Sequence, residues 1–326
     1  MNRALCLAIF AIFLACGCNS VFDSSDEAMG SRYVQRGMLD KGIAHLDRGI
    51  QNSPSAYAYH YRALAYMQKN DYPKMLADAK SSLALDDNAE IRYLIGWIYM
   101  RMDKPQLAAK EFGKSVGKEP GKQEFLCAQA ESFLASGDLP KAKEAASKAL
   151  KLNPNDIYSR TIEAKAIYCA GDFKLAIDKL EQLLKENPAP ASGKPAFWER
   201  MHDIWFRPSS RGWKCLGAED QLAWILATCP EAKLRNPDKA LILAKQAQSF
   251  LECSCIRDSL AAAYAAKGNF EEAKACEQKA LALLRNEFGD GYAVYSAKLS
   301  ERLERYKHGK PYVDNPADLA RIMITR

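Results

Sequence analysis

The chain has 326 residues, with 46 Lys and Arg against 40 Asp and Glu, and a formal net charge of +6. Both signs are interspersed along the sequence, which is typical of a solvated helical surface. No block of Lys and Arg alternates with aromatic residues, so we expect no nucleic-acid partner. The length is sufficient for a large core or a long repeat array.

The first residues predict an export signal. Asn2 and Arg3 give a basic start, and Leu5–Ala15 is an apolar run. About a dozen apolar residues form a signal-peptide core and are too short to span a bilayer. An ordinary cleaved signal is one interpretation of this segment.

Two cysteines directly after the apolar run favour a second interpretation. Cys18 follows Gly17 and has Ala15 at −3, while Cys16 is the alternative. Small residues before a cysteine resemble the bacterial lipoprotein signal, in which that cysteine carries the lipid. The resemblance implies a signal over 1–18, a polar tether over 19–27, and a lipid anchor in the bacterial cell envelope. The chain would face the periplasm or the exterior, with the outer membrane favoured over the inner.

Small and turn-forming residues recur on one grid between residues 30 and 188, with steps of 33, 33, 34 and 34. The first set is Gly30, Ala63, Gly96, Ala130 and Ala164; seven residues later come Gly37, Asn70, Asp103, Gly137 and Gly171; each unit closes with Pro54, Asp87, Pro120, Pro154 or Pro188. A period of about 34 residues is typical of a solenoid of stacked helix hairpins.

One unit explains the grid. The pattern predicts a helix over 124–136, a turn at Gly137 and a second helix that starts near Pro140 and ends near Lys151. Glycine accepts the left-handed conformation at a helix end, and proline at a helix start sacrifices no hydrogen bond. A small residue such as Ala130 lets the two helices approach closely. No hairpin buries its apolar face alone, so at least three must stack.

The second unit contains Tyr59, Arg62-Ala63, Ala65-Tyr66, Asn70-Asp71-Tyr72, Ala79 and Leu83-Ala84-Leu85-Asp86. These residues resemble the tetratricopeptide repeat family. The resemblance implies an all-α helix-hairpin solenoid of about seven repeats. Five repeats would cover 28–188 and two more 218–287, the sixth irregular with a lengthened inter-helix loop. A C-terminal capping helix and tail would follow over 288–326.

The grid breaks over 189–217, which is rich in Pro and Trp. After the prolines, Phe197, Trp198, Met201, Ile204 and Trp205 have a spacing that places them on one helical face. A plug helix that covers the fifth repeat is one hypothesis, and an exposed patch that binds a partner is the other.

No catalytic pattern is present. The sequence has no nucleophile elbow, phosphate loop or dinucleotide motif. Its four histidines are isolated, and Cys253-Ser254-Cys255 has no second cysteine pair at zinc-finger spacing. Glu131 and Glu163 are better explained by a solvated face than by acid–base chemistry. We therefore predict no enzyme, cofactor, metal or small-molecule substrate.

The family resemblance places the first helix of each hairpin on a concave groove, with positions 2, 5, 9 and 12 pointing into it. Among the residues at these positions, the candidates for partner binding are Tyr57, His60, Met67, Tyr93, Trp97, Met100, Glu131, Lys165 and Tyr168. Aromatic and methionine side chains suit an extended or apolar peptide segment. The predicted function is a protein-binding scaffold. A repeat-containing enzyme and a purely structural envelope protein are the alternatives.

Overall fold

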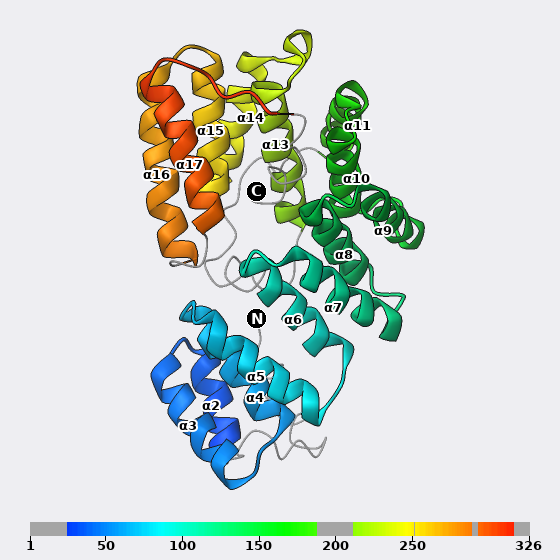
Figure 1. Ribbon diagram of the computed structural model, residues 1–326, viewed down its shortest axis with the longest axis vertical. Coiled ribbons are helices and arrows are strands. Elements are labelled where there is room, and N and C mark those ends of the chain that lie inside the picture. Colours follow the sequence, from blue (N-terminus) through cyan, green and yellow to red (C-terminus); the bar gives the residue numbers. More distant parts are fainter. Residues whose placement is uncertain (1–24, 188–210, 251, 289–292, 316–326) are drawn as a thin grey trace, which may run out of the picture. The chain divides into compact units, whose positions relative to one another are not determined.

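The computed structural model describes residues 25–187, 211–250, 252–288 and 293–315 (Figure 1). Over these ranges the chain forms fifteen α-helices and one short 3-10 helix, and no strand. The helices fall into two compact units, Met1–Asp87 and Asn88–Arg326. The expected all-α hairpin fold is confirmed.

The first unit consists of two hairpins. Their helices are α2 (Asp26–Gln35) with α3 (Leu39–Asn52), and α4 (Ala56–Gln68) with α5 (Tyr72–Leu85). Ser55 and Asp71 cap α4 and α5 by accepting hydrogen bonds from main-chain N–H groups. Arg62 on α4 donates to both carboxylate oxygens of the buried Asp78 on α5, at 2.8 and 2.7 Å. This bidentate pair joins the two helices of the second hairpin.

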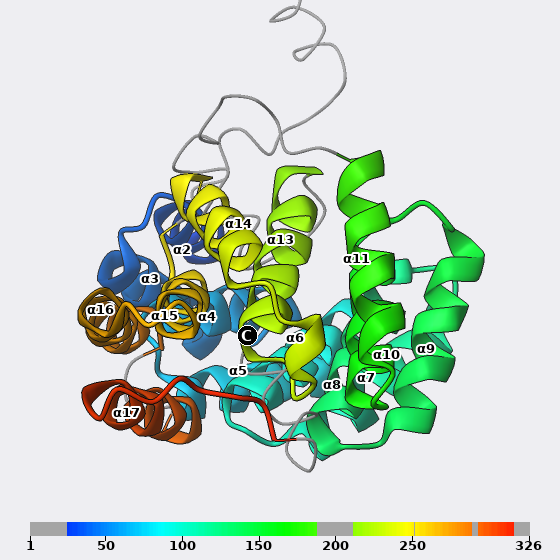
Figure 2. The same ribbon diagram turned by 90° about the horizontal axis from the view of Figure 1, so that it is seen from above.

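The second unit contains the remaining five hairpins and one further helix. Its helices are α6 (Ala89–Arg101), α7 (Pro105–Lys118), α8 (Gln123–Ser136), α9 (Leu139–Leu152), α10 (Ile157–Cys169), α11 (Phe173–Glu186), α13 (Arg211–Thr228), η2 (Ala232–Leu234), α14 (Pro237–Phe250), α15 (Ser254–Ala266), α16 (Phe270–Phe288) and α17 (Ala293–Lys307). Figure 2 shows α13 and α14 side by side. The 3-10 turn η2 lies in the long loop between them, so the sixth hairpin is irregular, as expected.

The turn positions of the grid have the predicted backbone conformation. Gly37, Gly137 and Gly171 have φ angles of 74°, 78° and 90°. Asn70 and Asp103 occupy the same turn position with φ of 57° and 54°. Asn and Asp tolerate this left-handed conformation better than other residues with a side chain, which explains why they replace glycine there.

The small residues of the grid lie where two helices cross. Ala63, Ala130 and Ala164 are fully buried. A Cβ atom added to Gly96 would lie 2.5 Å from Cε1 of Phe112, which is closer than atoms can pack. The glycine on α6 therefore makes room for the aromatic ring that α7 inserts between the helices.

Cys16, Cys18 and the expected plug helix lie outside the described residues. Within the described parts of the chain, no helix combines the length and the apolar character that crossing a membrane requires.

Candidate functional site

Helix α6 contributes two aromatic side chains to one surface of the second unit. Tyr93 and Trp97 are one turn apart and partly buried, with ring centroids 6.1 Å apart in an edge-to-face arrangement. Tyr93 also contacts Phe125 on α8 at 4.9 Å, and both rings contact Phe112 on α7 at 5.6 Å. Phe112 and Phe125 are fully buried, so they form the core side of the packing for the partly exposed Tyr93 and Trp97 rings.

Helices α8 and α10 extend this surface with acidic and phenolic groups. Burial raises the pKa of Tyr93 well above its ordinary value; a hydrogen bond from Trp97 opposes this, and the nearby Glu131 and Glu124 carboxylates add to it. Burial also raises the pKa of Tyr158 on α10, with Glu131 acting in the same direction. These effects place Glu131 close to both phenols. We call Tyr93, Trp97, Glu131 and Tyr158 the aromatic face.

The remaining groove candidates differ in their surroundings. Met100 is partly buried beside the aromatic face and packs on the Phe112 cluster. Lys165 on α10 is only 9% exposed, and Tyr168 is fully buried at 0%. The structure therefore brings Tyr93, Trp97 and Glu131 together on one surface, and it places Tyr168 inside the core rather than on an open groove.

Three candidates belong to the first unit. Tyr57 is 47% exposed, and its hydroxyl donates to Ser31 Oγ at 2.9 Å. Its ring lies 4.6 Å from that of Tyr61, which in turn contacts the ring of His60 at 5.7 Å. Met67 is buried in the core of this unit. Tyr57 and His60 are thus exposed or partly exposed aromatic residues of α4, whereas Met67 is not.

The buried Tyr168 contacts the C-terminal tail through its hydroxyl. Its hydroxyl donates to Asp314 Oδ2 at 2.8 Å. The same carboxylate accepts from Trp224 Nε1 on α13 at 3.1–3.2 Å and from Thr228 Oγ1 at 2.8 Å. The main-chain N–H of Asp314 donates to the carbonyl of Thr228 at 2.8 Å. We call Tyr168, Trp224 and Thr228 the carboxylate site.

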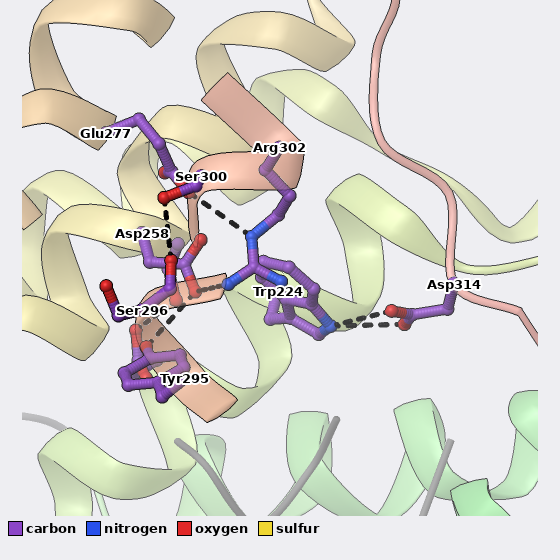
Figure 3. Close-up of polar contacts among 10 residues, drawn as sticks. Trp224, Asp258, Glu277, Tyr295, Ser296, Ser300, Arg302 and Asp314 are labelled. Carbon is purple, nitrogen blue, oxygen red and sulfur yellow. Dashed lines mark hydrogen bonds and ion pairs between the residues drawn. The ribbon is translucent and has the colours of Figure 1, made fainter. Parts of the chain in front are cut away.

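A buried ion-pair network lies beside this site (Figure 3). Arg302 on α17 is 2% exposed and donates to Asp258 Oδ2 at 2.8 Å and to Glu277 Oε1 at 3.3 Å. Its guanidinium carbon lies 5.2 Å from the centre of the Trp224 ring and 5.4 Å from that of Tyr312 in the tail. Arg302 thus joins α15 and α16 to α17 and also stacks on the residues around Asp314.

These C-terminal residues were not among the sequence-based candidates. Trp224 is the one tryptophan within an apolar, alanine-rich run, and Asp314 follows Tyr312 and Val313 in an otherwise unremarkable tail. A large indole among small residues indicates a special contact. Nothing in the local sequence, however, identifies a partner that is 90 residues away.

Glu219 on α13 leads to a prediction about pH. It is 4% exposed, its Oε2 has no hydrogen-bond partner, and burial raises its pKa from 4.5 to about 7. The folded state therefore binds the proton more tightly than the unfolded state. The protonated Glu219 carboxyl therefore contributes its full stabilisation below pH 4.5 and loses it as the pH rises to about 7. Over this range the free energy of unfolding falls by at most about 1.4 kcal/mol per pH unit.

Replacement of Glu219 by glutamine removes this ionisation. We expect Glu219→Gln to unfold at higher urea concentration than the unmodified chain at pH 8, with a smaller difference at pH 5. Glu272→Gln, at an exposed position on α16, is the matched control. An equal effect of Glu219→Gln at both pH values would show that the carboxyl does not titrate in this range.

The described residues contain no group of three or more His, Cys, Asp or Glu side chains arranged to hold a metal ion. The sulfur atoms of Cys253 and Cys255 lie 2.8 Å apart.

Comparison with known proteins identifies the repeats. Residues 93–157 match the tetratricopeptide repeat family model. The DnaJ homolog subfamily C member 7 homolog of Schizosaccharomyces pombe is 24% identical over 193 residues, 52% of this chain, and the chain spans 40% of that relative's length.

Two solved structures share the fold. A tetratricopeptide repeat protein from Parabacteroides merdae superposes with a TM-score of 0.63 at 14% identity, covering 85% of this chain and 96% of that protein. Yeast Tom70 gives a TM-score of 0.57 at 14% identity, over 88% of this chain and 56% of Tom70. The fold is therefore that of tetratricopeptide repeat proteins.

Proposed function

We propose that this chain, built on the tetratricopeptide repeat fold, is a scaffold that binds an extended segment of another protein across its aromatic face. The observation that carries the proposal is the cluster of Tyr93, Trp97, Glu131 and Tyr158 on three successive first helices. Stacked helix hairpins form extended binding surfaces, and partly buried aromatic rings are frequent energetic centres of interfaces.

The chemistry of the aromatic face indicates which segment it suits. Rings already held by Phe112 and Phe125 lose little conformational entropy when they bind an apolar side chain. Glu131 and Glu124 place negative charge beside Tyr93. A segment that carries an apolar side chain next to Lys or Arg would satisfy both features.

The test uses the full chain and a displayed library of random extended peptides. We expect the selected peptides to combine an apolar residue with Lys or Arg. Affinity should fall about tenfold in Glu131→Gln, which removes the charge and keeps the shape. Tyr93→Phe tests the hydroxyl without emptying the ring's position. Glu301→Gln, exposed on α17, is the control and should bind normally.

Two results would contradict the proposal. The first is that selected peptides bind Glu131→Gln and Tyr93→Phe as tightly as the unmodified chain. The second is that no peptide is selected while a substrate screen detects turnover, which would favour the rival hypothesis of a repeat-containing enzyme. Tyr93→Ala is a poorer probe because it also removes packing against Phe112 and Phe125.

The proposed scaffold is anchored to the bacterial cell envelope by a lipid on Cys18. The sequence Ala15-Cys16-Gly17-Cys18 after an apolar run supports this, and Cys16 is the alternative position. Stable anchoring needs two acyl chains or more. Mass spectrometry of the mature N-terminus should detect an acylated Cys18, and Cys18→Ser should release the protein from membranes. An unmodified start at another residue would refute the anchor and leave the scaffold proposal standing.

A further inference from the structure

The C-terminal tail has the form of a bound peptide. After α17 the chain turns at Gly309, which has φ of 64°, and residues 310–315 contain no helix or strand as they run back toward α13 (Figure 1). Tyr312 and Asp314 are two residues apart, so in an extended segment their side chains point to the same side. Both contact Trp224, Tyr312 through its ring at 5.7 Å and Asp314 through its carboxylate.

Asp314 is the most deeply buried residue of the tail. Asp314 is 2% exposed and accepts hydrogen bonds from Tyr168, Trp224 and Thr228. Neighbouring Pro311 and Asn315 are exposed. Tyr312 and Val313 between these ends are partly buried, and a short linear segment can be held on a folded surface by anchors two residues apart.

The carboxylate site has donors suited to an anion. It consists of two neutral side-chain O–H groups and one indole N–H from two different helices, α10 and α13. Burial of a carboxylate costs several kcal/mol of hydration free energy unless hydrogen bonds from the protein replace those from water. Hydrogen bonds to a charged acceptor are stronger than bonds between neutral groups. Lys165 adds positive charge nearby. Burial raises the pKa of the Cys169 thiol to about 12, Lys165 opposes this shift, and Asp314 adds to it.

We propose that the carboxylate site is a recognition site for an extended segment of the form aromatic–any residue–Asp, and that the chain's own tail occupies it as an intramolecular competitor. An acidic segment of a partner protein binds there by displacing Tyr312 and Asp314. A tethered segment has an effective concentration in the millimolar range, so a partner must exceed it or the tail must be released first. The carboxylate site is distinct from the aromatic face. The proposal for the carboxylate site therefore does not depend on partner binding at the aromatic face.

The test measures binding of a capped synthetic peptide, Pro-Tyr-Val-Asp-Asn, which is residues 311–315, to the full-length chain. The double variant Tyr312→Ala, Asp314→Ala removes the two side chains that occupy the site in the unmodified chain. We expect the peptide to bind this variant at least about tenfold more tightly than the unmodified chain. The peptide with Asn in place of Asp should bind at least about tenfold more weakly than the original.

A third substitution connects binding to the site itself. Trp224→Phe, added to the double variant, keeps a ring but removes the Nε1 donor, and should weaken peptide binding. Circular dichroism establishes that each variant is folded. If the double variant unfolds, the single variant Asp314→Asn, which keeps the shape of the tail, takes its place in the same comparison.

The proposal is overturned if a folded tail variant does not bind the peptide, or if it binds the Asp and Asn peptides equally. Loss of stability without peptide binding would also overturn it, since that result is expected of a tail with a purely structural role. The variants Glu131→Gln and Tyr93→Phe should bind this peptide normally, so the two proposed sites can fail independently.

Discussion

Replacing Arg302 by methionine is expected to lower the free energy of unfolding by about 3–5 kcal/mol, as is usual when one partner of a buried ion pair is removed. Asp258 and Glu277 are fully buried and face Arg302 at 2.8 and 3.3 Å. Without the guanidinium, two buried carboxylates lose the cation that offsets their lost hydration in the unmodified protein. Urea unfolding followed by circular dichroism measures the change.

A control on the same helix separates burial from charge. Lys307 pairs with Glu304 at the exposed surface of α17, at 2.7 Å. Lys307→Met should change stability by less than about 0.5 kcal/mol, because exposed pairs contribute little. Adding Asp258→Asn and Glu277→Gln to Arg302→Met should restore part of the loss, since both buried carboxylate charges are then gone. If these additions lower stability further, the buried carboxylate charges are not the cause.

Local rules predicted the hairpins because each hairpin is a local structure. The turn at Gly137 and the proline at the start of α9 act within one unit of about 34 residues. The expected helix over 124–136 is α8, Gln123–Ser136. Within the second compact unit, α7 packs on α8 and α9 packs on α10, so correct hairpins also predict how neighbouring hairpins stack there.

The aromatic face was only partly predictable. Helical spacing correctly put Tyr93 and Trp97 on one side of α6, because that depends on the helix alone. How deep a residue lies depends on what covers it. Tyr168 lies at the position of α10 that corresponds to Met100 on α6, and its buried hydroxyl donates to Asp314, which is 146 residues later in the sequence. Periodicity carries no information about such a distant contact, and for that reason the carboxylate site was missed.

Removal of the Phe112 ring should destabilise the second unit and also loosen the aromatic face. Phe112 is fully buried, and its ring supports both Tyr93 and Trp97 at 5.6 Å. We expect Phe112→Ala to lower the free energy of unfolding by about 3–5 kcal/mol, the usual range for a core phenylalanine. Leu107→Ala, at a 45% exposed position of the same helix, is the control and should have a much smaller effect.

Gly96 provides a coupled test of the same contact. With Phe112 present, Gly96→Ala places a methyl group 2.5 Å from the Phe112 ring. This substitution should lower the free energy of unfolding by about 1–3 kcal/mol. In the Phe112→Ala background that ring is absent, and alanine favours the helix over glycine by up to about 1 kcal/mol. The same substitution should therefore become neutral or stabilising. If Gly96→Ala has the same effect in both backgrounds, the glycine is not there to accommodate Phe112, and the close crossing of α6 and α7 must have another cause.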